Sequence, residues 1–86
     1  MDLDALLEHY FASTDPDAID AAQFAAGKER LTIDFGVEQE PSRKFALWAL
    51  MEALGFAPTP ADAFEDAGLK RAADDYLSAA WRLEQG

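Results

Sequence analysis

The stretch PSRKFALWALMEALG, residues 41–55, decides the fold of this 86-residue chain. Its last ten residues before the final glycine carry one polar side chain, Glu52, and otherwise only Phe, Leu, Trp, Met and Ala. A helix that is apolar nearly all round must be covered on more than one side. Pro41 suits the first helical turn, and Gly55 suits the left-handed residue that ends a helix. The pattern therefore predicts a central apolar helix over residues 41–54, with the rest of the chain packed around it.

The segments before this helix predict two further helices. Near the N-terminus, apolar side chains recur with the spacing of one helix face, at Leu3, Leu6, Leu7, Tyr10 and Phe11. The sequence Ser-Thr-Asp-Pro at residues 13–16 then signals a stop and a new helix start. We expect the second helix to run from about residue 16 to residue 26 and to end at Gly27, although the helical pattern could continue weakly to Leu31. Its apolar side is thin, because most of its nonpolar residues are alanine.

The period of the pattern changes at Leu31–Val37, where Leu, Ile, Phe and Val alternate with Thr, Asp and Gly. A two-residue repeat is typical of a half-buried β-strand. A strand cannot satisfy its backbone hydrogen bonds alone, and the chain holds no second run of this kind. Three arrangements stay open: an extended tether laid over the helices, a strand paired with its copy in a homodimer, or an edge offered to a partner protein. The tether is the favoured one.

The segments after the central helix predict a short helix and a long one. Thr59-Pro60-Ala61-Asp62 has the form of a capping box that opens a helix. Gly68 interrupts or ends this short helix, and from Leu69 an apolar stripe continues to Leu83. The whole pattern predicts a single small all-α domain over residues 1–86, with four to five helices around the central helix (41–54) and one extended or edge-strand segment (31–37).

Composition and charge exclude several classes of function. There is no cysteine, so disulfides, thiolate metal sites and thiol nucleophiles are absent. The net charge of −10 opposes nucleic-acid binding, which depends on basic side chains. No run approaches the ~20 apolar residues of a membrane span, and the N-terminus has acids where a signal peptide has bases. We therefore expect a cytoplasmic protein that contacts neither membrane nor nucleic acid.

The acidic residues are unevenly distributed along the chain. Residues 1–27 hold six acids and no Lys or Arg. Such a surface either serves solubility alone or attracts a protein partner with a basic surface. Solubility is the simpler interpretation, and the basic partner is the more specific one.

Residues able to carry catalysis are scarce. His9 is the only histidine, and no partner that would make it an acid–base catalyst is visible. Adjacent acids such as Asp74 and Asp75 point in different directions on a helix, and no calcium-binding loop is present. No phosphate loop, nucleophile elbow or paired-histidine motif occurs. The sequence predicts that the protein is not an enzyme and has no catalytic residue, metal or cofactor.

The central helix supplies the first interaction candidates. Phe45 and Trp48 lie on the side opposite its leucine-rich core face, and Glu52 follows Trp48 by one turn. An ionised Glu cannot be buried unpaired. Either this side is covered and Glu52 meets an Arg or Lys, or it is partly open and presents its aromatic side chains to a partner. The covered arrangement is favoured.

Four further residues complete the set of interaction candidates. Arg43 and Lys44 stand in the first turn of the central helix, where the helix dipole disfavours cations. Either neighbouring glutamates compensate this pair, or the pair holds an anion at the helix N-terminus. Ile33 and Phe35 belong to the alternating segment, whose edge would contact a partner.

The layout from Asp34 to Leu77 resembles an acyl carrier protein. The shared features are an acidic chain, Asp-Phe-Gly in a loop, a central helix that begins near a serine, a glycine at its end, a short helix and a final helix. Such carriers attach phosphopantetheine to the serine of an Asp-Ser-Leu motif. The resemblance covers about half of the chain and implies Ser42 as the attachment site, although Pro41 and Arg43 replace the flanking Asp and Leu.

These features favour a small, acidic, non-enzymatic interaction or regulatory domain that acts through protein–protein contacts. Self-association into a homodimer is left open. A divergent acyl-carrier-like protein, with Ser42 as the attachment site, is the alternative function.

Overall fold

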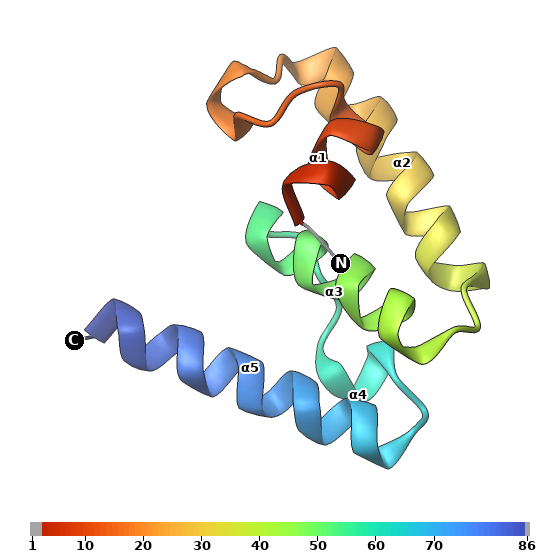
Figure 1. Ribbon diagram of the computed structural model, residues 1–86, viewed down its shortest axis with the longest axis vertical. Helices are drawn as coiled ribbons and strands as arrows, with labels where there is room; N and C mark the ends of the chain where they lie inside the picture. The colour runs from red at the N-terminus through yellow and green to blue at the C-terminus, as the bar shows by residue number, and fades with distance from the viewer. Residues whose placement is uncertain (1–2, 86) are drawn as a thin grey trace.

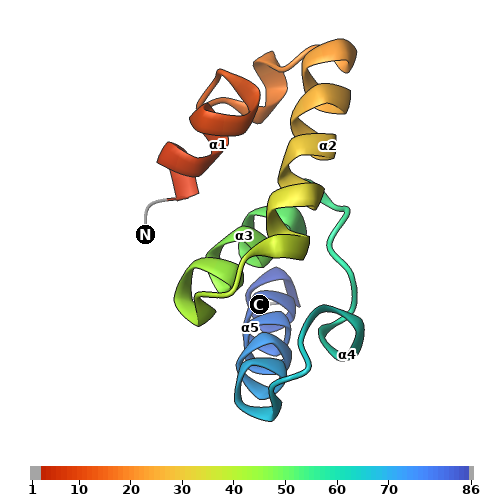
Figure 2. The ribbon, with the colours of Figure 1, turned by 90° about the vertical axis from the view of Figure 1, so that its right-hand side faces the viewer.

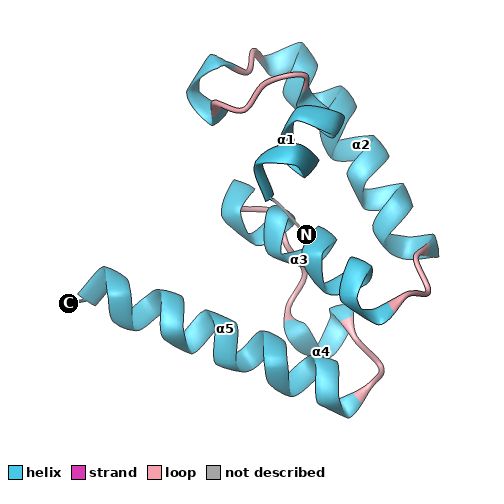
Figure 3. Cartoon of the chain, in the orientation of Figure 1, coloured by secondary structure: helices cyan, strands magenta, loops and turns pink. Residues whose placement is uncertain are grey.

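The computed structural model describes residues 3–85, and it describes all of their side chains except those of residues 16 and 80–85. The described chain is all-α, as predicted, and contains no β-strand (Figures 1 and 3). The elements in order are α1 (Leu3–Phe11), a 3-10 turn η1 (Pro16–Ala18), α2 (Ala21–Val37), α3 (Pro41–Leu54), α4 (Pro60–Ala63) and α5 (Ala67–Gln85).

The central helix predicted over residues 41–54 is confirmed as α3. Gly55, the residue directly after its last helical residue, adopts a left-handed conformation with φ 88°, as its sequence position predicts. Helices α1 and α2 pack on one side of α3, and α4 and α5 lie on the other (Figures 1 and 2). The five consecutive residues Leu47–Met51 are all buried, so core side chains leave α3 in every direction.

The predicted extended or edge-strand segment at Leu31–Val37 is wrong, in the favoured form of a tether as well as in the form of a strand, because this segment is the C-terminal half of α2. Four apolar residues at alternate positions are also two pairs spaced four apart, one on each face of a helix. Leu31 and Phe35 point into the core with exposed fractions of 0% and 8%, whereas Ile33 and Val37 point outward with 57% and 70%. The helix satisfies the backbone hydrogen bonds that an isolated strand would have left unpaired.

The predicted bounds of the second helix are also corrected. Helix α2 begins after Asp20, whose carboxylate accepts a hydrogen bond from the Gln23 backbone N–H at 2.7 Å, while the Gln23 side chain accepts from the Asp20 backbone N–H. This capping box fixes the first residue of α2 at Ala21, five residues beyond the predicted start at residue 16. The helix then passes through Gly27 without ending.

Gly27 is required for the close crossing of α1 and α2. A Cβ atom added there would lie 2.4 Å from the Phe11 ring and 2.6 Å from the Tyr10 carbonyl oxygen. Both residues belong to the inward stripe predicted for the first helix, which is confirmed: Leu6, Leu7, Tyr10 and Phe11 are all buried. The glycine at this position therefore serves helix packing and not helix termination.

The C-terminal elements differ from the prediction in detail. Thr59 precedes α4, as expected, but its side chain makes no capping hydrogen bond, so the predicted capping box is not formed. Gly68 does not end a helix, because it lies in the first turn of α5. The Asp66 carboxylate instead accepts a hydrogen bond from the Leu69 backbone N–H at 2.9 Å and holds the start of α5. Within residues 3–85, no helix is long and apolar enough to cross a bilayer.

Candidate functional site

The aromatic side of α3, marked by Phe45 and Trp48, is covered. Trp48 has an exposed fraction of 0%, and its indole N–H donates a hydrogen bond of 2.9 Å to the Pro58 carbonyl oxygen. The rings of Phe45 and Phe64 stack at 6.0 Å, and Tyr76 of α5 meets the Trp48 ring at 5.7 Å. The residues after Gly55 therefore build a second core against this side. Trp48 is fully buried and is a packing residue, whereas Phe45 packs on the same aromatic cluster but is only half-buried.

Among the described side chains, no Arg or Lys pairs with Glu52, although a covered face was expected to supply one. The Glu52 side chain is only half-buried. The remaining exposure keeps the carboxylate hydrated, which removes the need for a buried partner.

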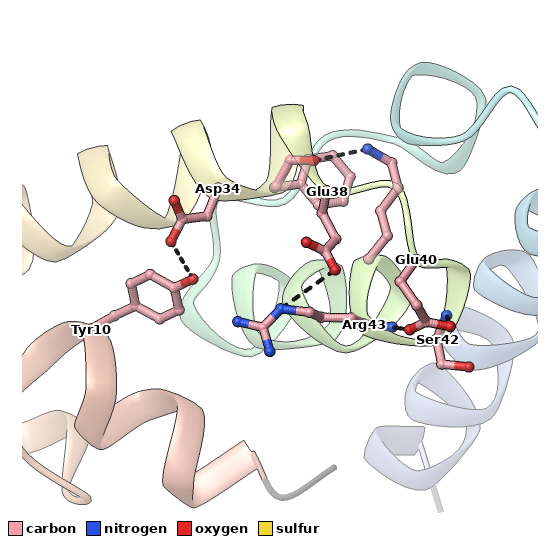
Figure 4. Close-up of polar contacts among 8 residues, drawn as sticks. Tyr10, Asp34, Glu38, Glu40, Ser42 and Arg43 are labelled. Carbon is pink, nitrogen blue, oxygen red and sulfur yellow. Dashed lines mark hydrogen bonds and ion pairs between the residues drawn. The ribbon is translucent and has the colours of Figure 1, made fainter.

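The basic pair at the start of α3 is compensated by neighbouring groups. Arg43 Nε lies 3.4 Å from the Glu38 carboxylate, and the Glu40 carboxylate accepts hydrogen bonds from the backbone N–H groups of Ser42 and Arg43 at 3.2 and 2.7 Å (Figure 4). Glu40 therefore occupies the donors at which an external anion would bind. This geometry agrees with compensation of the basic pair by neighbouring glutamates, and not with an anion held at the helix N-terminus.

Lys44 contributes to the joint between α2 and α3. Its ammonium group donates a hydrogen bond of 2.8 Å to the Phe35 carbonyl oxygen, which lies in the last turn of α2. The same group lies 4.1 Å from the centroid of the Phe35 ring. A cation near the last carbonyls of a helix is favourable, and a ring face adds attraction. Lys44 and Phe35 thus hold the two helices together.

One buried polar contact was not predicted from the sequence. The Tyr10 hydroxyl of α1 donates a hydrogen bond of 2.6 Å to the Asp34 carboxylate of α2 (Figure 4). Burial, together with the hydrogen bond to Asp34 and the charge of this carboxylate, raises the pKa of Tyr10 from its ordinary 10.0 to about 12. The contact was missed because a strand assignment for residues 31–37 gave Asp34 no fixed direction.

The largest apolar exposure in the described chain lies on α2. We call this side the outward α2 face, and it consists of residues that are all solvent-exposed: Ala22, Ala26, Glu29, Arg30, Ile33 and Val37. Its members recur at intervals of three, four or seven residues, so they form one stripe opposite Leu31 and Phe35. Of the earlier candidates, only Ile33 lies on this face. Val37 was missed as a candidate, although the same alternating segment contains it.

Among the hollows lined by described residues, two that lie beside α3 are relevant to the candidate site. The first, of about 440 Å³, is between the start of α1 and the first turns of α3, and its lining residues are Leu3, Glu40, Ser42, Arg43, Phe45, Ala46 and Ala49. The second, of about 400 Å³, is beside α4, and its lining residues are Gly36, Lys44, Asp62, Ala63, Phe64, Glu65, Asp66 and Leu69. Both are lined by a mixture of apolar and charged side chains.

Candidate metal ligands do not gather in the part of the chain that the structure describes, since no group of three His, Asp or Glu side chains occurs there. His9 is exposed, and its ring meets the edge of the Tyr10 ring at 4.8 Å. Within the described residues, the outward α2 face carries the two most exposed large apolar side chains, Ile33 and Val37.

Comparison of the chain with protein-family models, curated protein sequences and solved structures found no match.

Proposed function

We propose that this chain is a non-enzymatic, cytoplasmic interaction domain that acts through protein–protein contacts made by the outward α2 face. The observation that carries the proposal is the exposure of Ile33 and Val37, at 57% and 70%. Single exposed apolar residues are ordinary, but large apolar side chains exposed side by side are typical of a contact site. Ile33 and Val37 are one helical turn apart, and Ala22 and Ala26 lie on the same face beyond Glu29 and Arg30.

The acidic surface of the N-terminal third supports a partner that carries basic groups. Exposed acids occur on α1 and in the connection to α2 at Asp4, Glu8, Asp15, Asp17 and Asp20, and the first base after them is Lys28. Charge of one sign over such a region accelerates the encounter with a protein of opposite charge. The acids would steer the partner, and the outward α2 face would hold it.

A capture experiment tests this function. The full chain, immobilised, is exposed to a lysate of its native host, and specifically bound proteins are compared with those bound by an Ile33→Glu variant. Thr32→Glu is the matched control, because it adds the same charge at an exposed position about 100° away around the helix. We expect Ile33→Glu to lose the bound partner and Thr32→Glu to retain it. Equal capture by both variants would contradict the proposal.

Salt adds a second readout to the capture experiment. Attraction between exposed charges is screened when the Debye length shrinks, to about 3 Å at 1 M salt. If acids such as Asp15 and Asp17 steer a basic partner, capture should become slower as salt is raised, whereas an apolar contact at Ile33 should persist. Capture that is indifferent to salt would remove the basic partner from the proposal and leave the apolar contact.

An acyl-carrier-like function is the second candidate, and one observation favours it. Ser42 is exposed at the second position of α3 and lines the 440 Å³ hollow, together with the apolar side chains of Leu3, Phe45 and Ala49. The resemblance to acyl carrier proteins implies phosphopantetheine on this serine. Mass spectrometry of protein isolated from the native host would then show the adduct, and a Ser42→Ala variant would lack it. An unmodified parent mass would eliminate this candidate.

A further inference from the structure

We propose that the outward α2 face binds a second copy of this chain, with the two α2 helices antiparallel. The inference rests on the proposed interaction function, because it uses the same contact face, but it names another occupant: a second, equally acidic copy in place of a partner that carries basic groups. In this arrangement Val37 of one copy packs on Ala22 of the other, and Ile33 packs on Ala26. At the centre, Glu29 of each copy faces Arg30 of the other.

The spacing of the residues on α2 makes the face complementary to itself. A two-fold axis that passes between Glu29 and Arg30 relates position 37 to position 22, and position 33 to position 26. The two large apolar residues occupy one end of the stripe, and two alanines occupy the other. An antiparallel copy therefore sets each large side chain against a small one. An isologous interface of this kind is closed, so it stops at a dimer.

The central charges select the same orientation. Glu29 and Arg30 are both exposed, and neither forms an ion pair with another described residue. Within its own chain the Arg30 guanidinium carbon lies over the Tyr10 ring of α1, 6.0 Å from its centroid, which places Arg30 at the border of the outward α2 face nearest α1. An antiparallel pair brings each Glu29 to the Arg30 of the other copy, and the alternative parallel pair would set like charges together. Charge and size thus agree on one arrangement.

The expected dimer is weak and sensitive to salt. One helix face from each copy buries less than the ~1,200 Å² of a standard stable interface. Each chain also carries a net charge of −10, so two copies repel each other until salt screens them. We expect association in the range of ~10–500 µM at ~0.3 M NaCl, and weaker association when salt is lowered.

Sedimentation equilibrium of the full chain from about 10 µM to about 1 mM tests the proposal. Glu29→Arg and Arg30→Glu, made singly, should each weaken the dimer at least about tenfold, because like charges then meet at the centre. The double variant, which exchanges the two charges within one chain, should recover it. An equimolar mixture of the two single variants should form a heterodimer. Lys28→Glu makes the same charge change as Arg30→Glu but lies on another side of α2, above the Phe56 ring, so it should dimerise like the parent.

Three results would overturn the proposal: a parent that stays monomeric to about 1 mM, single variants that associate like the parent, or a double variant that does not recover. Val37→Ser tests the same interface without changing any charge. It should also weaken the dimer, because Val37 is the most exposed large apolar residue described. A monomeric parent whose Ile33→Glu variant still loses a captured partner would refute the second copy but leave the interaction function standing. Unchanged capture by Ile33→Glu would instead refute the interaction function.

Discussion

Replacing each of two glycines of α2 by alanine should change stability in opposite directions. Gly27 lies in the interior of α2, where Gly→Ala is favourable by about 0.8–1.0 kcal/mol, and Gly36 lies in its last turn. At Gly36 a Cβ atom meets nothing within 4 Å, so Gly36→Ala should add about 0.5–1 kcal/mol of stability. At Gly27 the new atom would lie 2.4 Å from the Phe11 ring and 2.6 Å from the Tyr10 carbonyl oxygen.

The contact with the Tyr10 carbonyl decides the magnitude at Gly27. An aromatic ring can tilt away, but a backbone oxygen moves only if α1 moves with it. Overpacking a core typically costs about 1–3 kcal/mol, which exceeds the gain in helix propensity. We therefore expect Gly27→Ala to lose about 1–2 kcal/mol, so that the two variants differ by roughly 1.5–3 kcal/mol. This difference corresponds to roughly 10–20 °C in Tm for a domain of this size.

Urea and thermal unfolding followed by far-UV circular dichroism measure both variants. A concentration of about 5 µM keeps the chain below the range in which association is expected. Gly36→Ala serves as the matched control, because it makes the same substitution on the same helix. If Gly27→Ala were as stable as Gly36→Ala, the close crossing of α1 and α2 would be refuted. If Gly36→Ala lost stability, the helical assignment of residues 31–37 would be in error.

Three other substitutions test separate contacts. Tyr10→Phe should cost about 1–3 kcal/mol near pH 8 by removing the hydrogen bond to Asp34. Because the pKa of Tyr10 in the folded state is raised from 10.0 to about 12, the parent has this stability in full below pH 10 and loses it as the pH rises to 12. In urea unfolding, the difference in free energy of unfolding between parent and variant should therefore shrink between pH 10 and pH 12. Gly55→Ala should cost about 1–2 kcal/mol in thermal unfolding, because φ is 88° and no neighbouring atom interferes; an unchanged Tm would contradict the left-handed cap. Glu40→Ala should cost about 0.5–2 kcal/mol through the loss of two capping hydrogen bonds, and a neutral result in urea would show that the cap is not formed.

The parts of the fold that local chemistry determines could be predicted from the sequence. Pro41 and Gly55 fix the two ends of α3 through backbone preferences that act within one turn. The stripe on α1 has only one helical interpretation. By contrast, Leu31–Val37 satisfies both a two-residue and a four-residue period, and only packing against α1 and α3 decides between them.

The candidate site was predicted less completely, because it depends on contacts between distant elements. Whether Trp48 is covered depends on Phe64 and Tyr76, which are brought to it by α4 and α5. The pairing of Arg43 with Glu38 could be predicted, since these residues are close in sequence. The outward α2 face could not be recognised until residues 31–37 were known to be helical, although Ile33 was already a candidate.

Backbone amide chemical shifts of the full chain, recorded from about 20 µM to about 1 mM at ~0.3 M NaCl, test the central claim most directly. If the outward α2 face binds a second copy, shifts should move with concentration at Ala22, Ala26, Ile33 and Val37, while buried Leu47 on α3 stays fixed. Shifts that do not change with concentration would contradict the claim, and so would changes that gather around Ser42 instead of α2.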